Sequence, residues 1–206
     1  MPILTDLTGL ASVACAMAAM LLRFPAVARL PKVRLAAMLG AVFVLSLIPF
    51  GGMPVAAYLR GATGDLSITT LVLLWSALLK PWCDRLMVDG KNRHALLTLV
   101  ALVALVFYPL ALGVGMFDPY RLGYGDSLFI AALLLIVLTA WINESSMILL
   151  CIALSTLAWS LGWYESDNLW DYLLDPFVVI YALAVIAILS VKKSMNRNRV
   201  STQNKS

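Results

Sequence analysis

The strongest constraint on this chain is a series of long apolar stretches separated by short polar segments. Seven such stretches occur, at residues 5–22, 35–54, 65–81, 95–114, 126–142, 145–163 and 176–191. A helix needs about 20 mostly apolar residues to cross the hydrocarbon core of a bilayer, and a spanning helix satisfies its own backbone hydrogen bonds. The pattern predicts an all-α fold, a polytopic transmembrane helical bundle of about seven spans that forms one domain over residues 1–191.

The amino-acid composition argues against an ordinary soluble fold. Hydrophobic residues make up 62% of the chain and charged residues 13%, whereas a soluble domain has about 45–50% apolar and about 25% charged residues. A soluble fold must cover its surface with polar groups, so this composition favours lipid as the solvent. The net charge of +4 does not indicate nucleic acid, because the basic residues flank the apolar stretches. We expect the lipid bilayer as the partner and no nucleic acid; other membrane subunits are compatible with this composition.

Charged residues predict the direction in which the chain crosses the membrane. On a seven-pass map, thirteen of the fifteen basic residues share one side, in segments 23–34, 80–94 and 192–206. Eight of the eleven acidic residues share the other side: Asp6, Asp65, Asp118, Asp126, Glu165, Asp167, Asp171 and Asp175. Short loops rich in Lys and Arg stay in the cytoplasm. We therefore expect the N-terminus outside, the C-terminus in the cytoplasm and a location in the plasma membrane, in the style of a bacterial inner-membrane protein.

Three further expectations concern a turn, a tryptophan and the C-terminal segment. A single helix over residues 126–163 would be about 57 Å long, far more than a hydrocarbon core of about 30 Å. The polar residues 143–146 therefore predict a tight turn between two helices. Trp75 lies deep in its stretch, and we expect it to pack between helices. The basic segment 192–206 has no apolar face, so we expect it to be a disordered tail.

Two loops on the predicted outer side share a pattern. Each has a proline, then glycines, a tyrosine and an arginine, and finally a Gly-Asp pair before the next apolar stretch. Arginine precedes aspartate by five positions in both, as Arg60 with Asp65 and Arg121 with Asp126. The spacing predicts an ion pair in each loop, worth about 0–1 kcal/mol if it is exposed. The two hairpins would form a parallel repeat.

An aspartate stands near the start of every stretch that runs inward: Asp6, Asp65, Asp126 and Asp175. Aspartate is a preferred N-cap residue, and its charge suits the positive end of the helix dipole. We therefore expect each of the four to cap a helix. The segment from Trp163 to Pro176 is predicted to form a short amphipathic helix on the outer surface, with Asp167 and Asp171 on one face.

The candidate functional residues are aromatic and charged side chains predicted to gather at the outer rim, which we call the outer collar. It comprises Arg60, Asp65, Asp118, Tyr120, Arg121, Asp126, Trp163, Glu165, Asp167, Trp170 and Asp171, with Tyr124, Tyr164 and Asp175 beside them. Such residues can bind a lipid head group, a sugar or a partner subunit. They can also serve only to anchor the helices at the interface and to cap them. Both interpretations stay open.

Catalytic and metal-binding patterns are weak in this sequence. The chain has one histidine and three widely separated cysteines, Cys15, Cys83 and Cys151. These numbers exclude a Cys/His metal cluster, and we expect no metal, no cofactor and reduced cysteines. Asp84, Asp89 and His94 share a predicted inner loop and could do acid–base chemistry, but a solvated basic loop explains them as well.

Three functions are compatible with these features. The first is a non-enzymatic membrane subunit in cell-envelope assembly or in the movement of a lipid-linked or polar substrate, suggested by a collar without a catalytic set. The second is a small transporter or channel built around the two hairpins. The absence of an ionisable side chain at mid-depth counts against proton coupling. The third is a membrane-embedded transferase that uses Asp84, Asp89 and His94 on a lipid substrate.

Overall fold

The computed structural model describes residues 2–83 and 90–203, and this part of the chain is all-α apart from one pair of two-residue strands. The elements in chain order are α1 (Pro2–Leu21), α2 (Pro25–Ala28), α3 (Lys32–Leu47), β1 (Pro49–Phe50), β2 (Met53–Pro54), α4 (Val55–Thr63), α5 (Ile68–Leu79), α6 (Gly90–Ala111), the 3-10 helix η2 (Pro119–Gly123), α7 (Ser127–Ile142), α8 (Ser146–Ser160), α9 (Leu169–Leu173) and α10 (Pro176–Gln203). The prediction of an all-α fold is confirmed.

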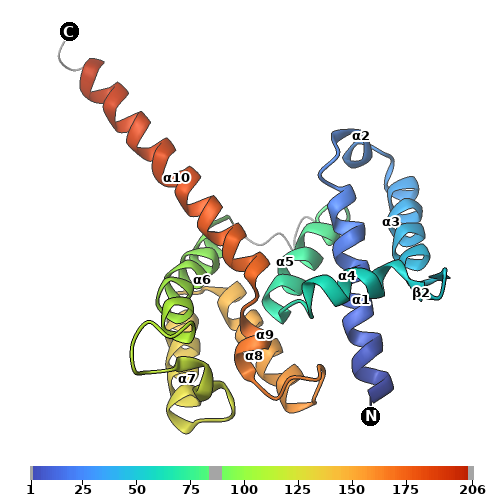
Figure 1. Cartoon of the computed structure of the whole chain (residues 1–206). Coiled ribbons are helices and arrows are strands. Elements are labelled where there is room, and N and C mark those ends of the chain that lie inside the picture. Colours follow the sequence, from blue (N-terminus) through green and yellow to red (C-terminus); the bar gives the residue numbers. More distant parts are fainter. Residues whose placement is uncertain (1, 84–89, 204–206) are drawn as a thin grey trace.

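Each of the seven predicted apolar stretches overlaps one of the longer helices: α1, α3, α5, α6, α7, α8 and α10. The N-terminus lies at one end of the bundle, and α2 and the C-terminus lie toward the other (Figure 1). We call these the acidic end and the basic end, after the charges that the sequence places in their loops. The predicted tight turn is present, because α7 ends at Ile142 and α8 begins at Ser146, with Glu144 at a φ of 54° between them.

Helix length does not by itself establish seven membrane spans. Among the described residues only α6 is long and apolar enough to cross a bilayer by length and composition, and five other apolar helices are shorter, at 10–17 residues. The shortest of them, α5, has 12 residues. At 1.5 Å per residue it rises about 18 Å, less than a hydrocarbon core of about 30 Å.

The predicted helical stretch 35–54 extends too far toward the C-terminus. Helix α3 stops at Leu47, and residues 49–54 form the hairpin of β1 and β2, in which Pro49 pairs with Pro54. The two prolines cannot continue a helix, and Gly51 and Gly52 between them have φ values of 67° and 110°. The segment that follows, predicted as a loop, is helix α4, which contacts α1 and lies across it (Figure 1).

The bundle has two apolar cores. The larger one is formed by all the helices from α5 through α10. It includes Leu97, Cys151, Leu169 and Tyr172, each at most 1% exposed. The smaller one joins α1, α3 and the end of α5 around Leu35, which is 1% exposed. Helix α5 contributes to both and contacts α1 on one side and α8 on the other. It therefore connects the two parts of the fold.

The outer sides of the long helices are apolar and exposed. Large hydrophobic side chains that are more than a third exposed occur along α3, α6, α7, α8 and α10, among them Val44, Leu45, Leu102, Leu105, Leu134, Leu135, Leu154, Leu157, Ile180 and Ile188. Trp75 is also 51% exposed, so the prediction that it packs between helices is wrong. A soluble monomer rarely exposes a large contiguous apolar surface.

The four aspartates play different roles. Asp126 is the N-cap of α7, as predicted, and accepts hydrogen bonds from the backbone N–H groups of Leu128 and Phe129. Asp6 lies inside α1, which begins at Pro2, and the N-cap of α5 is Ser67, so the capping prediction is wrong for Asp6 and Asp65.

Asp175 joins two helix starts. It is 5% exposed, and its Oδ1 accepts from the backbone N–H of Val178 in α10 at 2.8 Å. Its Oδ2 accepts from the backbone N–H of Ser67 at 2.7 Å and from the hydroxyl of Thr70 at 2.5 Å. One carboxylate therefore ties the starts of α5 and α10 together, although they lie more than 100 positions apart in the chain.

Two segments near the C-terminus differ from expectation. The short helix α9 does not lie on the surface, because Leu169 and Tyr172 are fully buried, and Asp167 precedes the helix. Helix α10 continues through the basic segment to Gln203, where the sequence predicted disorder. An uninterrupted helix carries the backbone hydrogen bonds of an existing apolar helix onward without a new nucleation step.

The double role of Asp175 yields a testable difference in stability. Asp175→Ala would leave donors of two helices without an acceptor, and should lower the free energy of unfolding by about 2–4 kcal/mol. Asp126→Ala removes one cap at a partly exposed site and should lower it by about 1 kcal/mol. Denaturant unfolding of the two variants in the same detergent measures both values. Equal losses would show that Asp175 caps only one helix.

Candidate functional site

Part of the outer collar lines a cavity of about 510 Å³ at the acidic end. Its lining residues come from the segment before α5, the end of α6, η2, α9 with the segment before it, and the start of α10. Five of them are carboxylates, Asp65, Asp118, Glu165, Asp171 and Asp175, and five are aromatic, Phe107, Tyr108, Tyr120, Tyr164 and Trp170. In the part of the chain that the structure describes, none of the lining residues is basic. We call this cavity the collar pocket.

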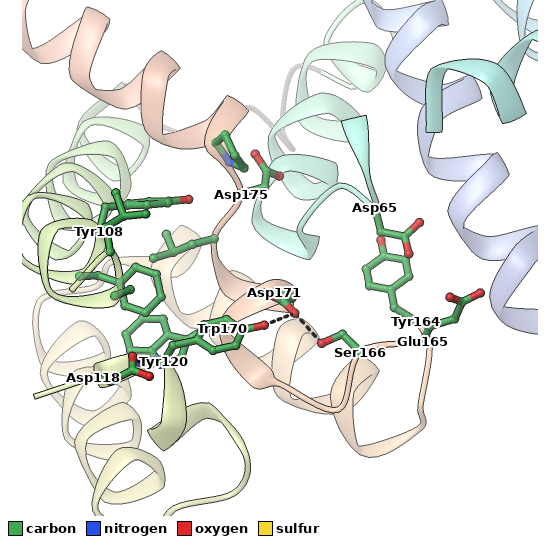
Figure 2. Close-up of a pocket in the computed structure, with 15 residues that line it drawn as sticks. Asp65, Tyr108, Asp118, Tyr120, Tyr164, Glu165, Ser166, Trp170, Asp171 and Asp175 are labelled. Carbon is green, nitrogen blue, oxygen red and sulfur yellow. Dashed lines mark hydrogen bonds between the residues drawn. The ribbon is translucent and has the colours of Figure 1, made fainter. Parts of the chain in front are cut away.

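Carboxylates occupy opposite sides of the collar pocket. Asp118 lies beside Tyr120 on one side, and Asp65 and Glu165 lie beside Tyr164 on the other (Figure 2). Asp171 and Asp175 lie between these two sides (Figure 2). The carboxylates therefore surround the cavity, and a group inside it would meet negative charge from several directions.

A group of stacked rings forms one wall. The Trp170 ring lies 4.4 Å from the Phe107 ring and 4.4 Å from the Phe129 ring, centroid to centroid. The Phe107 ring also approaches Tyr120, at 6.4 Å. Rings at these distances attract one another and make a stiff apolar surface. The wall therefore joins α6, α7 and η2 through one tryptophan of α9.

Asn168 holds η2 against α9. Its side chain donates to the backbone oxygen of Tyr120 at 2.9 Å and accepts from the backbone N–H of Trp170 at 2.9 Å. The close approach requires glycine at position 123, since a Cβ there would lie 1.8 Å from Oδ1 of Asn168. Asn168 is fully buried, so its amide fixes the position of the wall.

Asp171 is oriented by two hydroxyl groups. Tyr120 donates to its Oδ2 at 3.0 Å and Ser166 donates to the same oxygen at 2.5 Å (Figure 2). Burial, and then the charge of Asp171, raise the pKa of Tyr120 above its usual value. The phenol therefore stays protonated and remains a donor at neutral pH.

Arg60, in helix α4, lies close to three carboxylates at the edge of the pocket. Arg60 binds Asp65 through two hydrogen bonds, at 2.6 Å from Nε and 3.1 Å from a terminal nitrogen, and binds Asp6 at 2.9 Å. Glu165 lies 3.8 Å away. The hydrogen bond to Asp65 is the main cause that raises the pKa of Arg60 above its usual value. One positive charge faces three negative ones, so this edge remains acidic.

Tyr164 links the segment before α9 to the segment that precedes α5. Its hydroxyl donates to the backbone oxygen of Leu66 at 2.8 Å, and its ring stacks on Tyr172 with 5.2 Å between centroids. Burial, and then the charge of Asp65, raise the pKa of Tyr164 above its usual value. The Tyr172 hydroxyl in turn donates to the backbone oxygen of Ser166 at 3.0 Å.

The structure brings part of the predicted collar together. Six of its residues line the pocket: Asp65, Asp118, Tyr120, Glu165, Trp170 and Asp171. Arg60 contacts two of these, Asp65 and Glu165. Four lie elsewhere, as Asp126 caps α7, Arg121 and Asp167 are exposed, and Trp163 lines a different surface. Of the two predicted ion pairs, that of Arg60 with Asp65 is present, and among the described residues Arg121 makes none with Asp126.

Several residues that line the collar pocket are not among the predicted collar residues. Phe107 and Tyr108 were assigned only to a transmembrane stretch, although aromatic residues near the end of a stretch are a signal of an interfacial position. Ser166 had no sequence signal, because its hydroxyl matters only through its contact with Asp171.

Of the three inner-loop residues, the structure describes only His94. Asp84 and Asp89 lie outside the described residues, and His94 is exposed near the start of α6. Across residues 2–83 and 90–203, no group of three or more His, Cys, Asp or Glu side chains is placed to hold a metal ion.

Comparisons of the chain with protein-family models, with curated proteins and with solved structures found no match in any of the three. The geometry of the collar pocket is therefore the basis for inferring a function. Its defining features are a cavity, a ring of carboxylates and a stiff aromatic wall.

The ion pair between Arg60 and Asp65 can be tested through Gly9, a residue of α1 that faces both side chains. A Cβ on Gly9 would lie 2.3 Å from Nε of Arg60 and 2.3 Å from Oδ1 of Asp65. Gly9→Ala should therefore displace the ion pair and lower the free energy of unfolding by about 1–3 kcal/mol. In an Arg60→Ala background the penalty should fall by at least half, which a double-mutant cycle measures.

Gly40→Ala is the matched control, because nothing lies within 4 Å of a Cβ at this exposed position in helix α3. It should raise stability by about 0.4–1 kcal/mol. A Gly9→Ala penalty that is unchanged without Arg60 would show that the conflict is not with the arginine, which leaves Asp65 as the nearest group.

Proposed function

We propose that this protein is a non-enzymatic, multi-pass plasma-membrane protein, in the style of a bacterial inner-membrane protein. In this proposal seven helices cross the bilayer, the N-terminus is outside and the C-terminus is cytoplasmic. The collar pocket then opens at the outer surface and binds a cationic group of a substrate or partner. This role suits a subunit that acts with other membrane proteins in cell-envelope assembly or in moving a lipid-linked substrate.

The exposed apolar sides of the long helices support the membrane assignment. Side chains such as Leu102, Leu135 and Ile180 are 60–67% exposed. Burying one leucine-sized side chain is worth about 1.5–3 kcal/mol, so leaving many of them in water is strongly unfavourable. A bilayer removes this cost, and the polar loops then lie at its two surfaces.

The short helices are compatible with a bilayer that adapts to them. A hydrophobic stretch shorter than the hydrocarbon core is accommodated by local thinning of the bilayer or by flanking residues that reach the interface, at a fraction of a kcal/mol per Å. Helix α5 contacts both α1 and α8, so protein rather than lipid surrounds much of it.

The single observation that supports cation binding is the charge of the collar pocket. Five carboxylates and no basic residue line it within the described part of the chain, and Arg60 brings one positive charge to two of them, Asp65 and Glu165, at its edge. A cation gains favourable interactions with carboxylates and with the faces of aromatic rings. The volume of about 510 Å³ lies within the range of small-molecule pockets, about 300–1,000 Å³.

The membrane orientation is tested by thiol labelling of whole cells. In a background with Cys15, Cys83 and Cys151 replaced by alanine, Glu165→Cys and Lys192→Cys each place one exposed thiol at opposite ends of the bundle. A membrane-impermeant reagent should label position 165 in intact cells and position 192 only after permeabilisation. Labelling of both positions from the same side would overturn the seven-pass assignment.

Cation binding is tested with ethanolamine as the probe and ethylene glycol as its neutral counterpart. At low ionic strength ethanolamine should raise the thermal stability of the protein in detergent, and ethylene glycol at the same concentration should not. The double variant Asp118→Asn, Glu165→Gln keeps the shape of the pocket and removes two charges. It should weaken ethanolamine binding by about ten-fold or more.

Asp167→Asn is the control for this experiment. Asp167 is exposed on the same segment as Glu165 but does not line the pocket. The substitution should leave ethanolamine binding unchanged. Equal effects of the two sets of substitutions would mean that ethanolamine responds only to the net charge of the surface.

A further inference from the structure

A second hollow, also of about 510 Å³, runs along the bundle between α5 and α8. It extends from Ile68 and Leu161 at the acidic end to Lys80 and Met147 at the basic end. Its walls are almost entirely apolar side chains, and we call it the α5–α8 groove. Trp75, Leu157 and Leu161 in these walls are 51%, 54% and 65% exposed, so the groove opens to the side of the bundle.

The groove and the collar pocket meet at one stretch of chain. Trp163 lines the groove, and the next two residues, Tyr164 and Glu165, line the pocket. On the α5 side, Asp65 lines the pocket and Ile68, three positions later, lines the groove. The acidic end of the α5–α8 groove therefore lies within a few residues of the carboxylates of the collar pocket.

We propose that the two hollows form one binding site for a membrane lipid that carries a primary ammonium group. The acyl chain lies in the acidic-end half of the α5–α8 groove, and the ammonium group lies in the collar pocket among the carboxylates. This inference rests on the proposed function, because it requires the groove to face lipid and the pocket to bind a cation.

Charge and shape both favour this occupant. An ammonium group has three donors, and the collar pocket presents carboxylate oxygens from several directions, whereas the phenols of Tyr120 and Tyr164 already donate elsewhere. A lipid chain in the groove loses no hydrogen bond, since the groove walls are apolar. A head group without a cationic group, such as that of phosphatidylglycerol, would bring no positive charge to pair with the carboxylates.

Tethering explains why one ligand would use both hollows. Once the chain lies in the groove, the ammonium group is held near the pocket at a high effective concentration. A lipid should therefore bind more tightly than a free amine with the same head group. A lipid without the ammonium group should keep only the contribution of its chain.

The experiment is native mass spectrometry of the full chain released from detergent with phosphatidylethanolamine or phosphatidylglycerol of the same acyl chains. Retention of phosphatidylethanolamine should exceed that of phosphatidylglycerol by about ten-fold, the effect of one hydrogen bond between charged groups. Asp118→Asn with Glu165→Gln should remove this preference. Leu157→Trp, which narrows the groove, should lower retention of both lipids.

Leu138→Trp is the matched control, because Leu138 is 53% exposed on α7 and lies outside the groove. It should leave the retention of both lipids unchanged. Equal retention of the two lipids by the native protein would overturn the inference. So would capture of a partner's helix in the groove with no retained phosphatidylethanolamine.

Free ethanolamine separates this inference from the proposed function. If ethanolamine binds as tightly as phosphatidylethanolamine, the pocket binds cations but the groove is no part of the site, and only the lipid inference fails. If neither ethanolamine nor phosphatidylethanolamine binds, cation binding by the pocket fails as well.

Discussion

The sides of this bundle are apolar, so its polar groups have to find their partners at the two ends. The acidic end does this with a connected set of contacts in which side chains bind the backbone of segments far away in the chain. Asp175 binds the start of α5, Tyr164 binds Leu66, and Asn168 binds Tyr120. Among the described residues no fully buried side-chain polar atom is left without a partner. These contacts fix the positions of the segments that line the collar pocket.

Much of the fold could be predicted because apolar runs and turn residues are local signals. The positions of α6, α7 and α8 agree with the predicted stretches to within a few residues. The prediction failed where apolar residues do not form helix, as at Pro49–Pro54, and where polar residues do, as in the far part of α10. The exposure of Trp75 could not be read from its depth in the stretch, since it depends on which neighbour each helix face meets.

The sequence predicted the chemical character of the candidate site better than it predicted which residues line it. Aromatic and acidic residues of the loops pointed to the right end of the bundle, but the same Arg-to-Asp spacing gave two different outcomes. Arg60 reaches Asp65 where Gly9 of α1 leaves room for it. In the second loop Asp126 is occupied as a helix cap, and Arg121 points into solvent. Tertiary neighbours decided the difference, and no local pattern records them.

The continuity of α10 has a mechanical consequence. Its first residue, Pro176, lines the collar pocket, and Gln203, the last of its 28 residues, lies beyond the rest of the bundle (Figure 1). A helix of this length is a rod of about 42 Å, so a tilt of about 5° at one end moves the other by about 4 Å. Asp175 anchors the near end of this rod, because it binds the start of α5 as well as the start of α10. A displacement at the cavity would therefore be enlarged at the far end of α10, beyond the basic end of the bundle (Figure 1).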